Sequence, residues 1–150
     1  MEDRRQHREN LEEEATHATD EARMVLPGIQ AIMGFQLIAV FNQRFEALDP
    51  IDQRLHLVAF FLIMLAMGLL MAPAAYHRQR ERGRVTRRFV GLASNLMTWA
   101  LVPLMFGLAC DTYILVFMVL RESGDALAGA LIVVAVLASL WFVMPRVVKK

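Results

Sequence analysis

Four long apolar stretches dominate this sequence, and they restrict what it can fold into. A helix needs ~20 mainly apolar residues to cross the ~30 Å hydrocarbon core of a bilayer. The stretches predict transmembrane helices over about 27–48, 54–76, 90–120 and 125–145. The 57% hydrophobic content of the 150 residues exceeds that of typical soluble domains. Because two of the connecting loops are short, we expect an all-α membrane protein built as an antiparallel four-helix bundle.

A charged head precedes the apolar stretches. Residues 1–24 contain eight acids and four arginines, so we expect a cytosolic segment over 1–26 that is helical in part, followed by a transmembrane domain over 27–150. The first apolar run begins only at Met24, so we do not expect the head to act as a signal peptide. The sequence Leu26-Pro27-Gly28 should end the head's helix, since proline suits the first turn of a new helix.

Basic residues predict the orientation in the membrane. The loop between the second and third predicted helices contains six arginines and a single acid, Glu81. The head and the C-terminal tail also carry arginine or lysine. All three segments fall on one side if the chain crosses the membrane four times. Lys and Arg in short loops mark the cytoplasmic side, so both termini should be cytoplasmic.

The arginines of that loop have two open interpretations. They can serve topology alone, or they can contact anionic lipid head groups at the cytoplasmic side. Nucleic-acid binding, another role of basic clusters, is not expected. The candidates for head-group contact are Arg78, Arg80, Arg82, Arg84, Arg87 and Arg88.

Polar residues crowd the second half of the first predicted helix. If this helix climbs outward to Leu48 and the third climbs beside it, Arg44 and Asp111 reach similar depths in the outer half. A lone carboxylate at the centre of a membrane helix costs roughly 2.5–3.5 kcal/mol, so Asp111 should pair, take up a proton or face water. We expect an Arg44–Asp111 ion pair. The candidate polar site comprises Arg44, Asp111, Asn42, His56 and Tyr113.

The purpose of this site stays open at the level of sequence. The pair could be a structural staple between two helices, or a proton- or ion-responsive carboxylate in a wet vestibule. Gln36, placed near the midplane, and Gln43 lie seven residues apart and share one helix face. They are candidates for lining a pathway or for interhelical hydrogen bonds.

The sequence lacks the patterns of an enzyme. Metal and catalytic motifs need ligands or nucleophile and base at fixed spacings. The four histidines, His7, His17, His56 and His77, are scattered, and the glycines form no phosphate-binding loop. We therefore expect neither catalysis, nor a bound metal, nor a cofactor.

Two segments are familiar. The stretches LPGIQAIMGFQLIAVFNQRFEAL (Leu26–Leu48) and MAPAAYHR (Met71–Arg78) resemble a family of small bacterial four-helix membrane proteins classed as a domain of unknown function. The likeness covers the first two predicted helices well and the other two by their layout. It implies a bacterial inner-membrane location and a four-helix architecture, and it implies no activity or substrate.

Together these features predict a small integral membrane protein with two open functional classes. One four-helix unit encloses little space, so a conducting protein of this size should be a homo-oligomer. The leading hypothesis is an ion channel or transport component with polar groups of the first helix near the pathway. The alternative is a non-conducting accessory, assembly or lipid-binding membrane protein.

Overall fold

The protein is all-helical throughout its described parts. The computed structural model describes residues 2–80 and 86–148, with side chains from Glu13 onward except at 15, 18, 19 and 80. No strand occurs among these residues. The helices are α1 (Glu2–Val40), α2 (Gln43–Glu46), α3 (Pro50–Arg80), α4 (Arg87–Leu120), α5 (Ser123–Ala138), the π-helical turn η1 (Ser139–Val143) and α6 (Met144–Val147).

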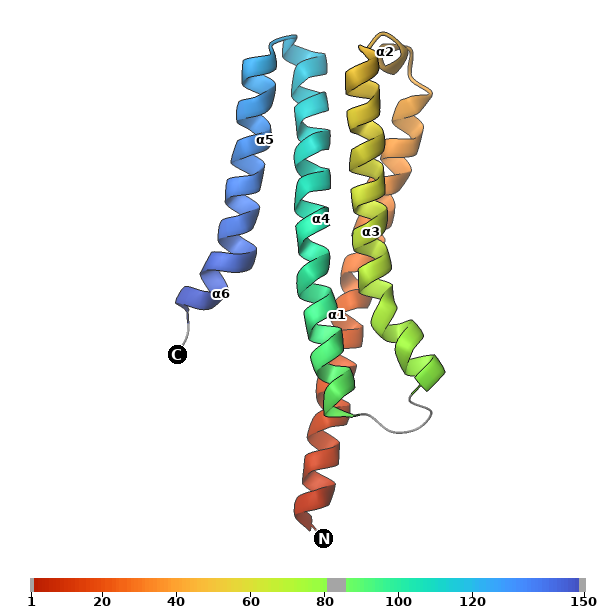
Figure 1. Ribbon diagram of the computed structural model, residues 1–150, viewed down its shortest axis with the longest axis vertical. Helices are drawn as coiled ribbons and strands as arrows, with labels where there is room; N and C mark the ends of the chain where they lie inside the picture. Colours follow the sequence, from red (N-terminus) through yellow and green to blue (C-terminus); the bar gives the residue numbers. More distant parts are fainter. Residues whose placement is uncertain (1, 81–85, 149–150) are drawn as a thin grey trace.

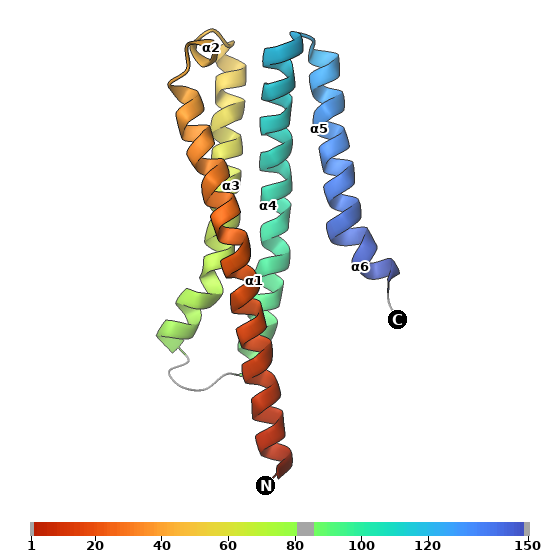
Figure 2. The same ribbon diagram turned by 180° about the vertical axis from the view of Figure 1, so that it is seen from behind.

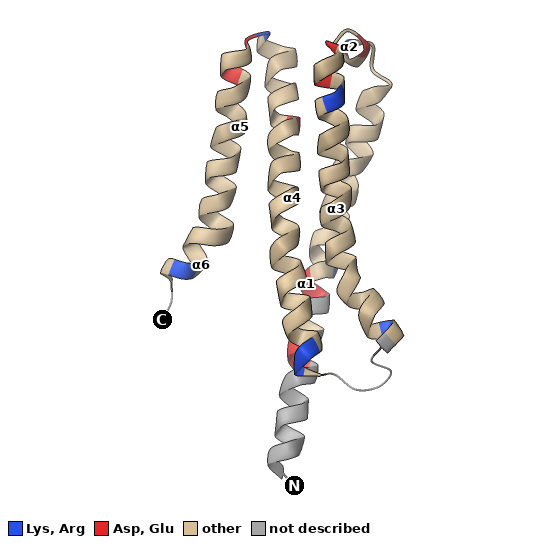
Figure 3. Cartoon of the chain, viewed as in Figure 1, with Lys and Arg blue, Asp and Glu red and all other residues tan. Residues whose placement is uncertain are grey.

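Four of the helical segments are long and apolar enough to cross a membrane. They are Asp20–Val40, Pro50–Gln79, Arg87–Leu120 and Ser123–Val147. Figure 3 shows that nearly all described charged residues lie toward the two ends of the helices, with uncharged ribbon between them. The prediction of an all-helical protein with four long apolar helices that could span a membrane is confirmed.

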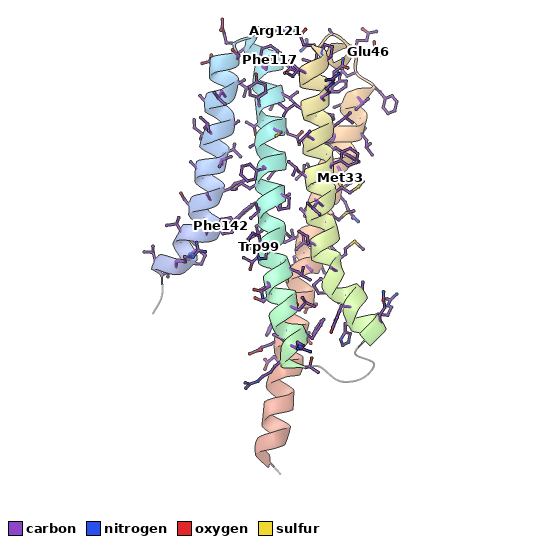
Figure 4. The ribbon with its side chains drawn as sticks, in the orientation of Figure 1. Met33, Glu46, Trp99, Phe117, Arg121 and Phe142 are labelled. Carbon is purple, nitrogen blue, oxygen red and sulfur yellow. The ribbon has the colours of Figure 1, made fainter. Side chains whose placement is uncertain are left out.

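Successive long helices run in opposite directions. In Figures 1 and 2, α1 rises from the N-terminus to α2, α3 returns, α4 rises again and α5 returns. The connection through α2 and the turn between α4 and α5 lie at one end, here called the α2 end. Glu46 and Arg121 mark this end in Figure 4. The N-terminus, the end of α3 and the start of α4 lie toward the other, the N-terminal end.

The predicted helix break at Leu26–Gly28 is wrong. Helix α1 continues through Pro27 without interruption, so the boundary expected between 26 and 27 separates no secondary-structure elements. A proline inside a helix removes one backbone hydrogen bond. Packing just beyond it offsets this loss, because Ile29 is only 2% exposed and belongs to the main core cluster. Prolines are tolerated in the same way within α3 and α4.

The first long helix also ends earlier than predicted, at Val40 in place of Leu48. Asn42 leaves the helical conformation with φ −88° and ψ 135° and becomes the N-cap of α2, its side chain accepting a hydrogen bond from the Arg44 amide. Gln53 of α3 donates to the carbonyls of Phe45 and Leu48 at 3.3 and 3.2 Å. The polar residues after position 41 therefore belong to a capped connection at the α2 end.

Substituting Asn42 tests this local arrangement. Asn42→Ala should lower the free energy of unfolding by about 0.5–2 kcal/mol, because the Arg44 amide loses its capping acceptor. Thermal unfolding in detergent measures the change. Gln43→Ala, at an exposed position of the same short helix, is the matched control and should leave stability close to wild type. Equal effects of the two variants would contradict a capping role.

The core lies mainly between α3 and α4, with α1 packed across both. Ala59, Ile63, Ala66 and Leu70 recur at helical spacing on α3 and are buried. The main cluster joins Ile63, Ala66 and Leu70 to Ile29 of α1 and to Ala100 and Leu104 of α4. Small residues allow helix backbones to approach closely in lipid.

One glycine lies where α3 and α4 approach each other closely. A Cβ on Gly107 would lie 2.6 Å from Ile63 Cγ1 and 3.2 Å from the Ala59 carbonyl oxygen. By contrast, Gly68, one of the small residues of α3, has nothing within 4 Å of an added Cβ. Helix α5 packs chiefly on α4. A Cβ added to Gly129 of α5 would lie 3.3 Å from Cγ2 of Val116 on α4.

Candidate polar site

Three helices bring a carboxylate, an imidazole and an amide together inside the bundle. Gln36 Nε2 of α1 donates a 2.7 Å hydrogen bond to Asp111 Oδ2 of α4. His56 Nδ1 of α3 lies 3.7 Å from Asp111 Oδ1. With a rise of 1.5 Å per residue, the three residues lie roughly 6–14 Å from the ends of their helices at the α2 end. We call Gln36, His56 and Asp111 the polar cluster.

The histidine tautomer follows from its second contact. His56 Nε2 lies 3.0 Å from the backbone carbonyl of Gln36, and a carbonyl oxygen only accepts hydrogen bonds. Nε2 must therefore carry a hydrogen. The side chain is 6% exposed, and the Phe45 ring packs edge-on against it at 5.0 Å. Its Nδ1 consequently faces Asp111 with either a lone pair or a second proton.

The contact between His56 Nδ1 and Asp111 Oδ1 can accommodate one shared proton. With neutral His56 and ionised Asp111, two acceptors face each other and repel. A proton on either Nδ1 or Oδ1 turns that contact into an attraction. The nearby amide of Gln36 stabilises the carboxylate oxygen that faces away from the histidine. Among the described residues no lysine or arginine forms an ion pair with Asp111, so nothing else on the described chain neutralises it.

Gln36 contributes an unsatisfied acceptor. The residue is 4% exposed, and its Oε1 atom has no hydrogen-bond partner. A buried polar atom without a partner costs about 1–3 kcal/mol. A buried unsatisfied polar atom calls for an explanation, and this one belongs to a residue that lines a cavity.

A cavity of about 470 Å³ opens beside the polar cluster. It lies between α1 and α4, and its lining includes Gln36, His56 and Asp111 themselves. Apolar and aromatic side chains form most of the remaining wall. They are Ile32, Phe35, Ala39, Phe45, Leu108, Ile114, Leu115 and Met118, with Asn42 and Thr112 as the other polar members. Pockets of this size and composition, with a few convergent polar groups, are typical of ligand sites.

The expected Arg44–Asp111 ion pair is absent from the described residues. Arg44 lies in α2, with its side chain exposed, because α1 ends before it and the chain has left the bundle interior. Gln36 takes the place predicted for Arg44. Gln36 lies four residues before the end of α1 at Val40, toward the α2 end. Gln43, predicted to share its face, is exposed in α2.

The other predicted residues divide between the cavity and its surroundings. His56 lies beside Asp111, and the sequence had placed both in one candidate polar site. Asn42 lines the cavity. Tyr113 packs beside a second core cluster of Phe45, Leu48 and Ile114 and stacks on Phe117. Phe45 and Thr112 were missed by sequence reasoning. A helical spacing from Asp111 along α4 points to Leu108 and Leu115 on the same face.

The basic loop is described only at its edges. Arg78, Arg87 and Arg88 are exposed at the N-terminal end. The side chain of Arg80 and all of Arg82 and Arg84 lie outside the described residues. Beside the loop, Thr86 caps α4 through the Phe89 amide at 3.2 Å.

These observations define a membrane protein of four long apolar helices with a polar cluster beside a cavity near one end. The chain belongs to a family of unknown function, DUF6328, whose sequence profile matches residues 4–145. This result confirms the resemblance noted from the sequence. No curated protein and no solved structure matches the chain.

Proposed function

We propose that this protein is a small membrane transport component whose polar cluster takes up and releases a proton. The observation that carries the proposal is the contact of Asp111 with His56 and Gln36 within helices that can cross a membrane. Ionisable residues inside transmembrane segments are costly and generally mark ion or proton pathways. The cavity beside the cluster supplies a route to it.

The orientation and environment of the protein are part of the proposal. We place both termini and the exposed arginines Arg78, Arg87 and Arg88 at the cytoplasmic face of a bacterial inner membrane. The positive-inside rule and the location of these arginines at the N-terminal end support this placement. In this orientation they contact anionic head groups, and the polar cluster lies in the outer half of the membrane.

A titration of the purified protein tests the proton site. Above about pH 6, where exposed carboxyl groups are ionised, wild-type protein in detergent should take up about one proton that Asp111→Asn does not, because the amide cannot share a proton with His56. Potentiometric titration measures the difference. The carboxyl C=O band in infrared difference spectra should disappear in the same variant. Asp125→Asn, which removes an exposed carboxylate at the α2 end, should leave that band unchanged.

The alternative is a non-conducting accessory protein that assembles with itself or with another membrane protein. Helix α5 supports it, since the apolar segment Ser123–Val147 is the least buried of the four and α5 packs chiefly on α4, which leaves most of its surface for lipid or for a second protein. Proton flux into vesicles containing the purified protein, driven by an imposed potential, separates the two. Flux that Asp111→Asn abolishes supports transport. A protein that shows no flux and whose titration matches Asp111→Asn would support the accessory role.

A further inference from the structure

We propose that the cavity between α1 and α4 binds a lipophilic organic cation, with its charged centre against Asp111 and its apolar groups along the two helices. The inference builds on the proposed proton site and names the class of ligand for it. A single bound cation would take the place of the single proton. The argument rests on the polar atoms of the cavity, on its apolar wall and on its opening.

Most of the polar atoms around Asp111 that remain available are acceptors. His56 uses its Nε2 hydrogen on the Gln36 carbonyl, and Gln36 uses one of its two amide hydrogens on Asp111. The remaining acceptors are the Asp111 carboxylate, the His56 Nδ1 lone pair and the buried, unpartnered Gln36 Oε1, and the remaining donor is the second hydrogen of the Gln36 amide. The Thr112 hydroxyl is also used as a donor, to the Leu108 carbonyl at 2.8 Å. Such a set attracts a positive ligand and repels a phosphate or carboxylate head group.

The wall of the cavity suits the rest of an organic cation. Phe35 and Phe45 contribute aromatic rings to the lining, and aromatic faces attract organic cations within about 6 Å. Ile32, Leu108 and Met118 supply aliphatic surface. A small inorganic ion would leave most of the 470 Å³ without suitable contacts. A cation with apolar substituents fills the space and buries them.

The cavity is accessible from the side of the bundle. Phe35 is 71% exposed and Leu115 is 64% exposed, although both line it. Both lie within segments that can span a membrane, so their exposed surfaces face lipid. A lipophilic cation dissolved in the membrane can therefore enter without crossing the packed interface of α3 and α4.

Binding of the cation should displace the proton. The titratable group facing Asp111 from α3 is His56, and Cys110 is its neighbour on α4. Helix α1 presents the uncharged Gln36 there. Helix α5, which packs on α4, carries one charged residue, Asp125, at an exposed position in its first turn. Because one carboxylate serves both ligands, the cation and the proton compete, and the exchange leaves the charge of the site unchanged.

Equilibrium binding of tetraphenylphosphonium to the full-length protein tests the inference. We expect saturable binding that releases about one proton per chain and weakens about tenfold for each pH unit where the free site is protonated. Asp111→Asn should weaken binding by roughly thirtyfold or more through loss of the charge partner. Asp111→Glu, which keeps the charge, should retain measurable binding. Asp125→Asn is the matched control and should bind as the wild type does.

Several outcomes would overturn the inference. Equal binding of the neutral triphenylphosphine oxide would show a pocket for neutral amphiphiles, and undiminished binding by folded Asp111→Asn would place the cation elsewhere. A protein whose Asp111 titrates but which binds no tetraphenylphosphonium at any pH would refute the cation site and leave the proton site intact. Cation binding that depends on Asp111 but releases no proton would refute the proton site instead.

Discussion

Gly107→Ala should lower the free energy of unfolding by about 1–3 kcal/mol, the range for overpacking a close-packed core. The added Cβ would lie 2.6 Å from Ile63 Cγ1, and Ile63 is fully buried at the centre of the main cluster. Ile63 Cδ1 and the Ala59 carbonyl oxygen are also close, at 3.3 and 3.2 Å, and the oxygen belongs to the α3 backbone and cannot turn aside. Relief therefore requires α3 and α4 to move apart. Thermal unfolding in detergent gives the change.

Gly91→Ala is the matched control for this substitution. Gly91 lies in the same helix, and nothing comes within 4 Å of an added Cβ there. The change should stabilise α4 by up to ~1 kcal/mol through helix propensity. Gly107→Leu should be more severe and prevent folded protein from accumulating. If Gly107→Ala matched Gly91→Ala, the close approach of α3 and α4 would not contribute to stability.

The sequence predicts the helices well because apolar length is a strong signal. The second, third and fourth predicted helices, at about 54–76, 90–120 and 125–145, fall within or close to the observed segments. The exception is the end of the first helix. Asn42 is a good N-cap residue, yet Phe45 and Leu48 beyond it extend the apolar pattern of the helix. Eight residues of helix span ~12 Å, so placing the end of the helix at Leu48 and not at Val40 shifted the expected positions of the polar residues by about that distance.

The sequence predicted Asp111 and His56 in one polar site, but not the partner of Asp111 on α1. Asp111 stood out because an acid within an apolar run needs a partner, and that reasoning needs no structure. Arg44 was predicted as the partner of Asp111 because a continuous first helix would carry Arg44 to the level of Asp111. Since α1 ends at Val40, Arg44 lies outside that helix. Shortening the helix brings Gln36 toward the α2 end and level with Asp111. The rotation of each helix about its axis, which decides that His56 and Gln36 face inward, depends on packing that periodicity alone does not specify.

The structure also bears on whether the cluster is a staple or a site. A staple is expected to satisfy the hydrogen bonds of its members, because partly satisfied buried networks are costly. Here Gln36 Oε1 has no partner and His56 Nδ1 faces a carboxylate at 3.7 Å. Both features sit beside a cavity. A stabilising role would require these atoms to be better satisfied than they are.

The double variant Gln36→Leu with Asp111→Leu should be about as stable as the wild type, while the single variant Asp111→Leu should lose about 1–3 kcal/mol. The single change leaves the buried Gln36 amide without its acceptor. The double change replaces both partners by apolar groups of similar size, which is often neutral or stabilising. His56 keeps its bond to the Gln36 backbone carbonyl in both variants. Unfolding in detergent measures the stabilities, and tetraphenylphosphonium binding should be lost in both.

A staple predicts the opposite for the double variant. If the hydrogen bond between Gln36 and Asp111 held α1 to α4, removing both partners would leave the protein as unstable as the single variant. Recovery of stability with loss of binding would mean that the chain keeps a costly polar pair inside an apolar bundle for a reason other than folding. The reason that the geometry supports is a ligand, because Gln36 Oε1 has no partner and Gln36, His56 and Asp111 all line the cavity.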